Sequence, residues 1–442
     1  MVVGLAGAAL GVTGCAHYPV NAPLARFDPQ AGYRFGSCPP TDKNTDDVFV
    51  VLAFSAGGMR SAAYAYGLLE ELQRTPVYFA GPPRSLLDEV DVISAVSSSS
   101  ITAAYYAAYP AQIFATFPPR VLYRDLDAQV WAYLLNPVNW VRLASPAFSR
   151  SDLLAELFDN EVYDHLTYAD LIRAHRRPYV LLNAADISLG ARFEFSQAQF
   201  DFLYSDLASV PLARAVTASM ATLVFMPPVV LENHPHGADF AEPAWLNATL
   251  ADPGASRRVQ RRAQMLRSYA DAAHRPYIHL VDGGYGDYLG LQGPLVSFLS
   301  PDGDFSIRRL INEHKIRKLV IISANAIRTP DLAWDRTRRA PNWLDMFYFG
   351  LSTPIRNSSI EMVTVLQDLL KADHANKDTP AYESYFITMD FSGVNDPVLR
   401  QRLEHLPTSL ALTREQVDDL RRAAAETLRH SPEFQRLLKD LN

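Results

Sequence analysis

The chain has very few cysteines, only Cys15 and Cys38 in 442 residues, and both lie near the N-terminus. Two cysteines cannot form a disulfide framework in a chain of this length, and the paired Cys and His spacings of metal sites are missing. We therefore expect neither a disulfide-stabilised fold nor a bound metal or other cofactor.

Long runs of lysine and arginine are also missing, and the net charge is -7 with 20% charged residues. Binding to a phosphate backbone needs clustered cations, so this composition argues against a nucleic acid partner. The arginines between positions 257 and 262 fall in a helical pattern and indicate a solvated helix face. No segment reaches about 18 uninterrupted apolar residues, so we expect no transmembrane helix.

The N-terminus is apolar over residues 2–14, VVGLAGAALGVTG, and this segment stops directly at Cys15. Val12 to Cys15 resembles the lipobox of bacterial lipoproteins, in which the cysteine is lipidated and becomes the new N-terminus. The resemblance implies a signal segment over 1–14 and a lipid anchor on Cys15. It also implies a membrane-anchored protein of the bacterial envelope, at the outer membrane and facing the periplasm. No Lys or Arg precedes the apolar segment, and an ordinary apolar N-terminus with a chance cysteine is the alternative.

Strand-like and helix-like segments alternate after a loop-rich linker over residues 15–45. Continuous apolar runs separated by helical patterns predict an α/β fold, with a mostly parallel central sheet buried on both faces. The predicted strands are 47–54, 91–96, 178–187, 277–281, 318–324 and 384–391; helices are predicted at 61–74, 101–109 and 151–158.

Three stretches look like additions to this core. Residues 111–150 are rich in aromatics and proline, 229–275 contain a loop and a basic helix, and 331–442 form a mostly helical C-terminal extension. We expect a catalytic domain over 46–330, with the extension packed on the same domain. Packing against the sheet is the simplest role for these additions, but 111–150 and 340–355 could also face lipid.

The first candidate site element is Ser55-Ala56-Gly57-Gly58, between a strand and a helix that begins near Arg60. Backbone N–H groups at such a helix start point outward and bind negative charge, and adjacent glycines allow close approach. No G-x-G-x-x-G or G-K-[ST] pattern fits a nucleotide loop here, so an oxyanion hole is the better interpretation.

The second element is the run Ser97 to Ser100, between the strand at 91–96 and the helix after it. A serine at a strand-to-helix turn is typical of a nucleophile elbow, G-x-S-x-G. Around Ser97, Ala95 and Ser99 replace the two glycines. By itself the run could equally be a set of helix-capping serines.

The third element is Asp282, at the end of a predicted strand and followed by Gly283-Gly284. A carboxylate at a strand end can reach a neighbouring elbow and act as a base. Alternatively, Asp282 only stabilises its own turn.

Taken in order, these three elements resemble the patatin-like phospholipase family, which has a Gly-rich loop with Arg, a G-x-S-x-G elbow and a D-G-[GA] aspartate. The segment 192–231, with its A-V-x-A-S run, resembles the part that supports the active site. The resemblance covers about residues 46–330 and implies a patatin-like α/β/α layered fold with helical insertions.

The resemblance implies a lipid acyl hydrolase with a Ser97–Asp282 dyad, in which Ser97 is the nucleophile and Asp282 the general base. Gly57, Gly58 and Met59 would supply the oxyanion hole, and Arg60 would order that loop. The implied substrate is an acyl ester of a phospholipid or lysophospholipid at a membrane surface. Asp287, in the same turn as Asp282, is expected to be structural.

Two alternatives stay open. Ala95 and Ser99 add atoms where strand meets helix, and Ala56 restricts the backbone of the loop, so a catalytically weakened protein that binds lipid or a partner is possible. A Ser-His-Asp hydrolase is the other, although His279 faces away from Asp282 on its strand. His234 and His236 lie in a loop, and His314 lies in a helix-like run.

Overall fold

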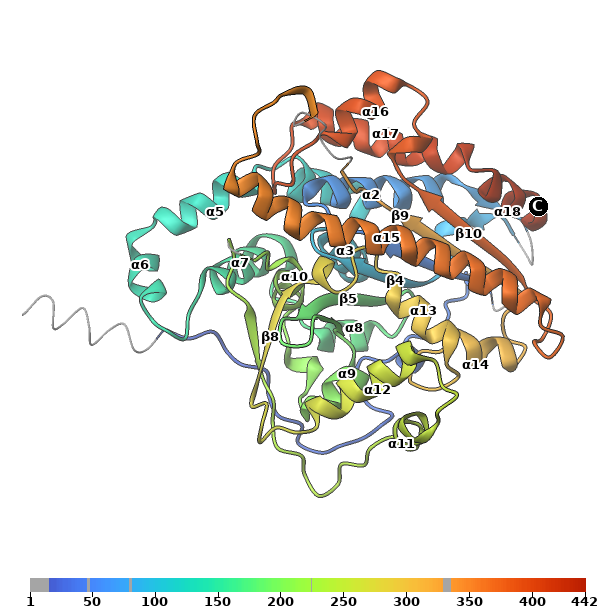
Figure 1. The fold of residues 1–442 in the computed structure, drawn as a ribbon, viewed down its shortest axis with the longest axis horizontal. Coiled ribbons are helices and arrows are strands. Elements are labelled where there is room, and N and C mark those ends of the chain that lie inside the picture. The colour runs from blue at the N-terminus through green and yellow to red at the C-terminus, as the bar shows by residue number, and fades with distance from the viewer. Residues whose placement is uncertain (1–15, 46–47, 79–81, 224, 329–334) are drawn as a thin grey trace, which may run out of the picture.

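The computed structural model describes residues 16–45, 48–78, 82–223, 225–328 and 335–442 (Figure 1). The predicted signal segment 1–14 and Cys15 lie outside the described residues. Residues 16–45, expected as a linker, lie against the body of the protein: Tyr33 and Cys38 are buried, and the Tyr33 hydroxyl accepts a 2.8 Å hydrogen bond from the Val180 N–H. This stretch therefore packs as part of the domain.

One large sheet forms the centre of the molecule, with strands in the order β10-β9-β1-β4-β5-β8-β7 and with β6 paired to β5. The five strands from β10 to β5 run parallel. Their side chains are mostly buried, which is typical of a parallel sheet covered on both faces. The strands are β1 (Val48–Phe54), β4 (Val90–Val96), β5 (Tyr179–Asp186), β6 (Ala191–Glu194), β7 (Val229–Glu232), β8 (Tyr277–Asp282), β9 (Lys318–Ala324) and β10 (Glu383–Met389). A separate pair, β2 (Pro76–Val77) and β3 (Arg84–Ser85), forms a small two-stranded sheet.

All six strands predicted from the sequence form, and the mostly parallel sheet is confirmed. The strand at 277–281 is an exception in direction, because β8 runs antiparallel to both β5 and β7. Between β5 and β8 the chain forms two further strands of the same sheet, β6 antiparallel to β5 and β7 antiparallel to β8. Its first residues alternate between exposed and buried, the pattern of a strand with one solvated face.

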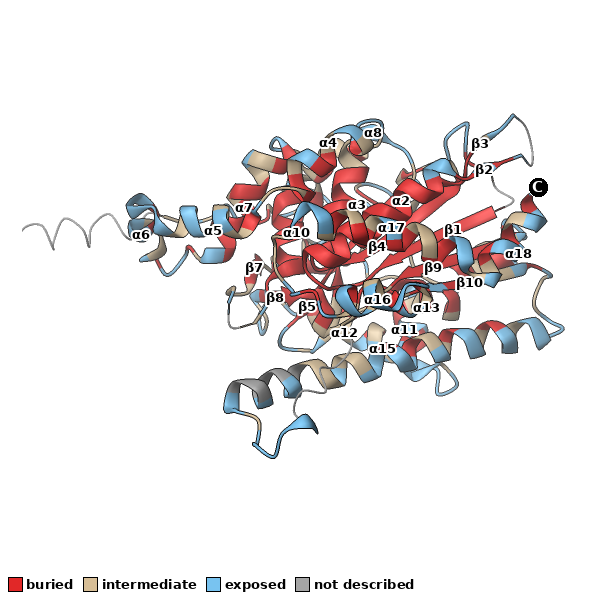
Figure 2. Cartoon of the chain, turned by 90° about the horizontal axis from the view of Figure 1, so that it is seen from above, coloured by how far each residue is buried: buried red, intermediate tan, exposed pale blue. Residues whose placement is uncertain are grey.

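Helices cover both faces of the sheet, which gives the three-layered α/β/α arrangement (Figures 1 and 2). On one side α2 packs against α3 and α17, and α3 packs against α10; on the other lie α12 to α15. The main helices are α2 (Met59–Arg74), α3 (Ser99–Ala108), α4 (Ile113–Phe117), α5 (Leu126–Leu135), α6 (Pro137–Leu143), α7 (Arg150–Phe158), α8 (Tyr168–Ala174), α9 (Gln197–Phe200), α10 (Leu212–Met220), α11 (Ala244–Ala251), α12 (Arg257–Tyr269), α13 (Gln292–Leu299), α14 (Ile307–Asn312), α15 (Trp343–Ala375), α16 (Pro397–Glu404), α17 (Arg414–His430) and α18 (Pro432–Leu441).

The C-terminal extension, expected to be helical, also supplies β10, which pairs with β9 along its whole length. The extension therefore completes the central sheet as well as covering it. Within the described ranges, none of the helices combines the length and apolar character that a bilayer crossing requires, and this includes the 33-residue α15.

Candidate active site

The candidate nucleophile Ser97 lies between the end of β4 at Val96 and the start of α3 at Ser99. Its backbone is in the left-handed region, with φ of +57°, which is uncommon for a residue with a side chain. Such a conformation costs on the order of 1–3 kcal/mol and persists only where the surroundings enforce it. A strained serine between a strand and a helix is the geometry of a nucleophile elbow.

Two residues, Ala95 and Ser99, replace the glycines of the elbow. Both are accommodated in the interior of the protein, where they are fully buried. The Ser99 hydroxyl lies 2.8 Å from the Val96 carbonyl oxygen and 3.2 Å from the Phe54 carbonyl oxygen, and it accepts from the Val96 N–H. It therefore joins the ends of β4 and β1 at the turn. We expected the Ser99 side chain to crowd the turn; instead, its hydroxyl forms hydrogen bonds there.

Asp282 meets the elbow directly. The Ser97 hydroxyl donates a 2.6 Å hydrogen bond to Asp282 Oδ2, and both residues are more than nine-tenths buried. The other carboxylate oxygen, Oδ1, accepts from the Gly284 N–H at 2.8 Å, and the Thr222 hydroxyl lies 3.4 Å from Oδ2. These bonds fix the carboxylate with one oxygen aimed at the serine.

Burial raises the pKa of the Asp282 carboxyl to about 6, although the hydrogen bonds from Ser97, Gly284 and Thr222 lower it in part. A carboxylate with this pKa is a stronger base than an ordinary aspartate, and it is still mostly ionised at neutral pH. These are the properties that a general base needs.

The antiparallel direction of β8 brings Asp282 to the elbow. Asp282 pairs with Ala184 of β5, and Val96 of β4 pairs with the neighbouring Asn183. The two candidate residues therefore end at the same level of the sheet, on either side of β5. Gly283 is required for this approach, because a Cβ there would lie 2.1 Å from the Asn183 carbonyl oxygen.

The predicted oxyanion loop follows β1, which lies next to β4. Gly57 and Gly58 have φ of +148° and +68°, while the residue before them, Ala56, has no positive φ. The restriction expected from alanine at this position is thus avoided. In the part of the chain that the structure describes, the N–H groups of Gly57 and Gly58 donate to no protein acceptor, so both can meet an oxyanion.

The backbone N–H of Met59, the third predicted oxyanion donor, already forms another hydrogen bond. Its N–H donates a 2.8 Å hydrogen bond to the carbonyl oxygen of Ser409, in the segment between α16 and α17. A Cβ on Gly58 would lie 2.8 Å from the same oxygen. The assignment of Met59 is therefore corrected, because a long-range contact that the sequence does not announce occupies its donor.

Arg60 holds the loop in place. Its side chain is buried, with Nε donating to the Ala326 carbonyl oxygen at 2.7 Å and Nη1 donating to the Leu406 carbonyl oxygen at 2.6 Å. These bonds tie the loop to the segment after β9 and to the C-terminal extension. The guanidinium is thus committed to ordering the backbone.

Ser219, in α10, is a residue that sequence reasoning did not single out. Its hydroxyl accepts from the Ser97 N–H at 2.8 Å and donates to the Asn183 carbonyl oxygen at 2.6 Å. The Ser100 hydroxyl lies 2.8 Å away and completes the contact. Ser219 closes the A-V-x-A-S run at 215–219, so the only available signal was a small polar residue in an otherwise apolar helix.

The histidines that could have formed a catalytic triad with Ser97 and Asp282 are engaged elsewhere or exposed. His279 is exposed on β8, between buried neighbours. His234 bonds through its ring to the Asn21 carbonyl oxygen, and His236 to that of Phe202. His314 is exposed at the end of α14. Asp287 accepts from the N–H groups of Leu291 and Gln292 and so stabilises the start of α13.

This chain resembles known proteins both in sequence and in structure. A sequence model of the family described as "Patatin-like phospholipase" matches residues 52–288, from within β1 to beyond the Asp282 turn. Among solved structures, human GIVD cytosolic phospholipase A2 in complex with methyl gamma-linolenyl fluorophosphonate is similar at 12% identity and a TM-score of 0.43. That match covers 90% of this chain and 59% of the human one.

The same human phospholipase without the inhibitor matches at 11% identity, with a TM-score of 0.40, over 90% of this chain and 62% of the other. This chain therefore spans about three-fifths of the structures it resembles. A comparison with curated proteins finds no significant match. Because the family match extends over more than half of the sequence, from the end of β1 through the elbow to the Asp282 turn, the chain belongs to the patatin-like phospholipase family.

Proposed function

We propose that this protein is a serine lipid acyl hydrolase that cleaves acyl esters of phospholipids or lysophospholipids. The observation that carries the proposal is the 2.6 Å hydrogen bond from Ser97 to the buried Asp282 carboxylate, at a serine held with positive φ. Membership of the patatin-like phospholipase family supports a carboxylic ester as the substrate.

In the first half of the reaction, Asp282 takes the proton of the Ser97 hydroxyl while the oxygen attacks the ester carbonyl carbon. The carbonyl oxygen becomes an oxyanion and is stabilised by the N–H groups of Gly57 and Gly58. When the tetrahedral intermediate collapses, the ester C–O bond breaks. Asp282 returns the proton to the leaving alcohol, and the acyl group stays on Ser97.

In the second half, water takes the place of the alcohol. Asp282 accepts a proton from the water as its oxygen attacks the acyl-Ser97 carbonyl, and the same loop stabilises the second oxyanion. Collapse releases the fatty acid and returns the proton to Ser97. The cycle uses the one carboxylate as base and as acid, so it needs no histidine.

A weakened enzyme that binds lipid or a partner is the second candidate. It is favoured by one observation, the use of the Met59 N–H by Ser409, which leaves two glycine donors for the oxyanion. Loss of one such donor costs about 100- to 1000-fold in kcat where it has been removed from other hydrolases. This candidate predicts lipid binding with little or no turnover.

Hydrolysis assays separate the two candidates. We expect wild-type protein to cleave short-chain nitrophenyl esters and lysophospholipid, and Ser97→Ala and Asp282→Asn to lower kcat by at least about 1000-fold. A fluorophosphonate should label a single peptide, the one containing Ser97. Full activity in Ser97→Ala would contradict the nucleophile assignment, and wild-type protein that binds lipid without turnover would favour the second candidate.

We further propose that Cys15 carries a lipid anchor at the bacterial envelope, on the outer membrane and facing the periplasm. The support is the apolar segment 2–14 that stops at this cysteine. Metabolic labelling with an alkyne fatty acid should label wild-type protein and not Cys15→Ser. Equal labelling of both, or of neither, would favour the ordinary apolar N-terminus.

A further inference from the structure

Among the described side chains of the long helix α15, the large apolar ones that are buried lie in its C-terminal half. Met362, Leu366 and Leu370 are buried there, whereas none of the described side chains over residues 343–358 is buried. At about 1.5 Å per residue, the stretch 343–358 is roughly 24 Å long. Figure 2 shows it projecting along one side of the molecule, coloured exposed and intermediate, while the packed half carries buried residues.

Residues 343–358 present large apolar side chains to solvent. Trp343 is 74% exposed and Met346 55% exposed. A helix face of this kind needs a partner, because large apolar groups left in water lose the free energy that burial supplies.

A basic segment leads into this helix. Arg336, Arg338 and Arg339 are all exposed, and within the described residues none of them forms an ion pair. The only acidic residue in the described segment 335–342 is Asp335. Three arginines against one aspartate, beside exposed apolar groups, give this end of α15 a positive, amphipathic character.

A second exposed apolar element is formed by α5 and α6. Trp131 and Trp140 are 63% and 57% exposed, and Leu135 and Val138 are exposed with them. The indole N–H of Trp140 donates to the Leu134 carbonyl oxygen at 2.7 Å, which fixes the ring at the turn between the two helices. With Trp343, three of the five tryptophans of the chain are exposed on these two elements.

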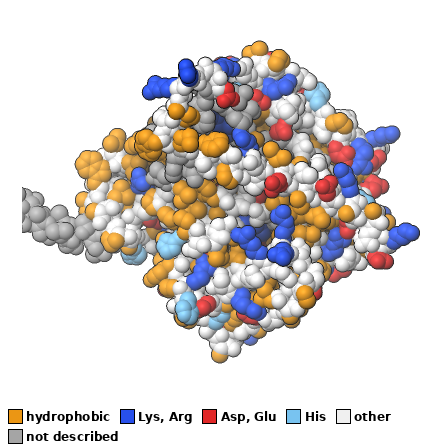
Figure 3. All heavy atoms as spheres, viewed as in Figure 1, with side chains coloured by type: hydrophobic (Ala, Val, Ile, Leu, Met, Phe, Trp, Pro, Cys, Tyr) orange, Lys and Arg blue, Asp and Glu red, His pale blue; other side chains and the backbone are white. Residues whose placement is uncertain are grey.

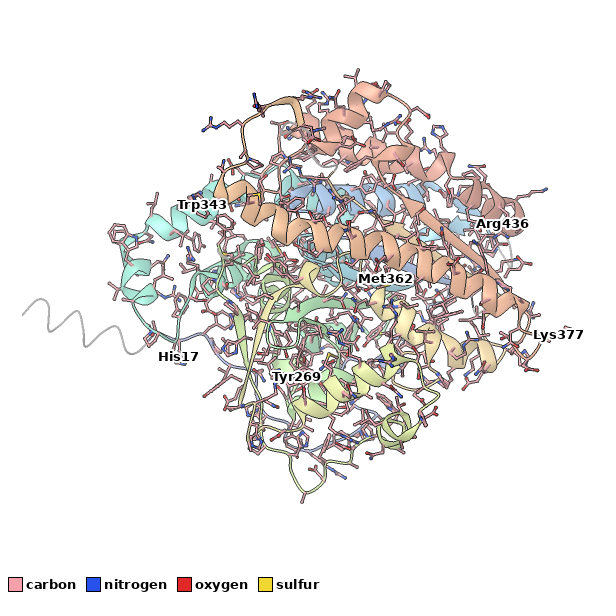
Figure 4. The ribbon with its side chains drawn as sticks, in the orientation of Figure 1. His17, Tyr269, Trp343, Met362, Lys377 and Arg436 are labelled. Carbon is pink, nitrogen blue, oxygen red and sulfur yellow. The ribbon has the colours of Figure 1, made fainter. Side chains whose placement is uncertain are left out.

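Both elements lie at one end of the molecule. In Figures 1 and 2, α5, α6 and the start of α15 share the left end, and in Figure 4 Trp343 is labelled there, away from the packed Met362. Figure 3 shows hydrophobic side chains gathered over this end. The described chain also starts here, since the Ser145 hydroxyl after α6 bonds to the Ala16 carbonyl oxygen at 2.6 Å. Ala16, the first described residue, therefore lies at this end.

We infer that this end, formed by α5, α6 and residues 335–358, binds the surface of an anionic phospholipid bilayer. Tryptophan side chains favour the membrane interface, and clustered arginines bind anionic headgroups. The two elements project separately from the body, so a flat, extended partner can touch both, and a bilayer is such a partner. The inference deepens the proposed hydrolase function and rests on it for the nature of the substrate.

This end is also connected to the candidate site. Asp127, in the first turn of α5, accepts a 3.1 Å hydrogen bond from the Leu410 N–H, and the adjacent Ser409 accepts from Met59 of the oxyanion loop. A bilayer bound by α5 would therefore lie one short segment away from the loop that holds the oxyanion.

Vesicle sedimentation tests the inference. The parent variant for this assay is the full chain with Ser97→Ala, so that no lipid is consumed, and Cys15→Ser, so that no lipid anchor contributes to binding. We expect tighter binding to vesicles of equal phosphatidylglycerol and phosphatidylcholine than to phosphatidylcholine alone. Arg336→Ser/Arg338→Ser/Arg339→Ser should weaken binding to the anionic vesicles by about 100-fold, since each basic residue near the surface contributes about fivefold.

A matched control removes the same charge elsewhere. Arg257, Arg258 and Arg261 are exposed on α12, and Arg257→Ser/Arg258→Ser/Arg261→Ser changes the net charge by the same three units. This control should bind like the parent chain. Equal binding by the Arg336 triple variant and this control would overturn the inference.

The apolar contribution has its own pair of variants. Trp131→Ser/Trp343→Ser should weaken binding to both kinds of vesicle by about tenfold, while Val398→Ser, at an equally exposed position on α16, should not. If the tryptophan variant keeps its vesicle affinity and instead converts a dimer to a monomer in sedimentation velocity, a second copy covers this end and the inference is wrong.

Hydrolysis of a soluble nitrophenyl butyrate separates this inference from the proposed function. In the chain with Ser97 restored, the surface variants should hydrolyse it at the parent rate. Vesicle binding without any hydrolysis of the soluble ester would support the docking end and count against the hydrolase. Hydrolysis of the soluble ester without vesicle binding would support the hydrolase and count against membrane binding by this end.

Discussion

The four consecutive serines from Ser97 to Ser100 occupy four different environments. Ser97 turns the backbone and bonds to Asp282, Ser99 joins the ends of β4 and β1, and Ser100 contacts Ser219. Ser98 has right-handed helical backbone angles and leads into α3. In the usual elbow a glycine avoids contact at the position of Ser99; here a buried hydroxyl makes the contact and satisfies its own polar group.

The pKa of Asp282 predicts the pH dependence of the reaction. Only the ionised carboxylate can accept the Ser97 proton, and burial raises the pKa of this group to about 6. We therefore expect kcat/KM for a soluble ester to be constant above about pH 7 and to fall tenfold per pH unit well below 6. A profile that stays flat down to pH 4.5 would contradict the role of Asp282 as base.

Ser219 is expected to act as a positioning residue for the nucleophile. Ser219→Ala removes the acceptor of the Ser97 N–H, a bond of about 1 kcal/mol within the network that holds the strained turn. We expect kcat to fall by about 5- to 10-fold, KM to change little, and labelling by a fluorophosphonate to slow in parallel.

The control for Ser219 is Ser297→Ala in α13. Ser297 is also buried, and among the described residues its hydroxyl bonds only to the Pro294 carbonyl oxygen of its own helix. A general effect of removing a buried hydroxyl would appear in both variants. If the two variants have the same kcat, Ser219 has no positioning role.

At the scale of secondary structure elements, the oxyanion loop depends on segments far away in sequence. Its glycines can turn freely, so its shape is set by neighbours: the Ala56 N–H bonds to Tyr288, the Met59 N–H bonds to Ser409, and Arg60 bonds to Ala326 and Leu406. Flexible loops carry function when rigid elements fix them in this way.

Arg60→Ala tests this arrangement. It leaves two buried carbonyl oxygens without their charged donor, and hydrogen bonds to charged groups contribute about 1.5–3 kcal/mol each. We expect the free energy of unfolding to fall by about 2–4 kcal/mol in denaturant titration and kcat to fall more than KM rises. Unchanged kcat with the expected loss of stability would show that the loop keeps its shape without Arg60.

At the scale of the whole molecule, the family match ends at residue 288, but the sheet does not. β9 and β10 follow it, and α17 from the extension packs along α2. Arg421 bonds to Glu70 at 2.8 and 2.9 Å across this contact. The extension thus covers both a strand edge and the helix that follows the oxyanion loop.

Removal of residues 331–442 is expected to abolish folding. The truncation would expose the edge of β9 and the face of α2 that α17 covers, and an uncovered apolar edge strand promotes aggregation. We expect insoluble protein, or protein without a cooperative thermal transition in circular dichroism. A soluble, monomeric and cooperatively folding 1–330 fragment would show instead that the extension is an independent addition.

Much of this architecture could be predicted from local sequence pattern. Continuous apolar runs identified the six strands, because a strand buried on both faces must be apolar throughout. The same reasoning placed Ser97 at a strand-to-helix turn and Asp282 at a strand end, since both are properties of short segments. The direction of β8 could not be predicted, because pairing direction depends on how the chain returns after residues 187–276.

From the sequence alone, Ser97, Asp282, Gly57 and Gly58 could be named as candidates for the chemistry, since they stand in a recognisable order with the right neighbours. Tertiary structure decided which of them meet and which donors stay available. The 2.6 Å contact of Ser97 with Asp282 needs β8 to run antiparallel, and the loss of the Met59 donor needs Ser409, 350 residues later in the chain. The strand pairing and the Met59–Ser409 bond join distant segments through backbone groups that every residue carries, so no pattern of side chains announces them.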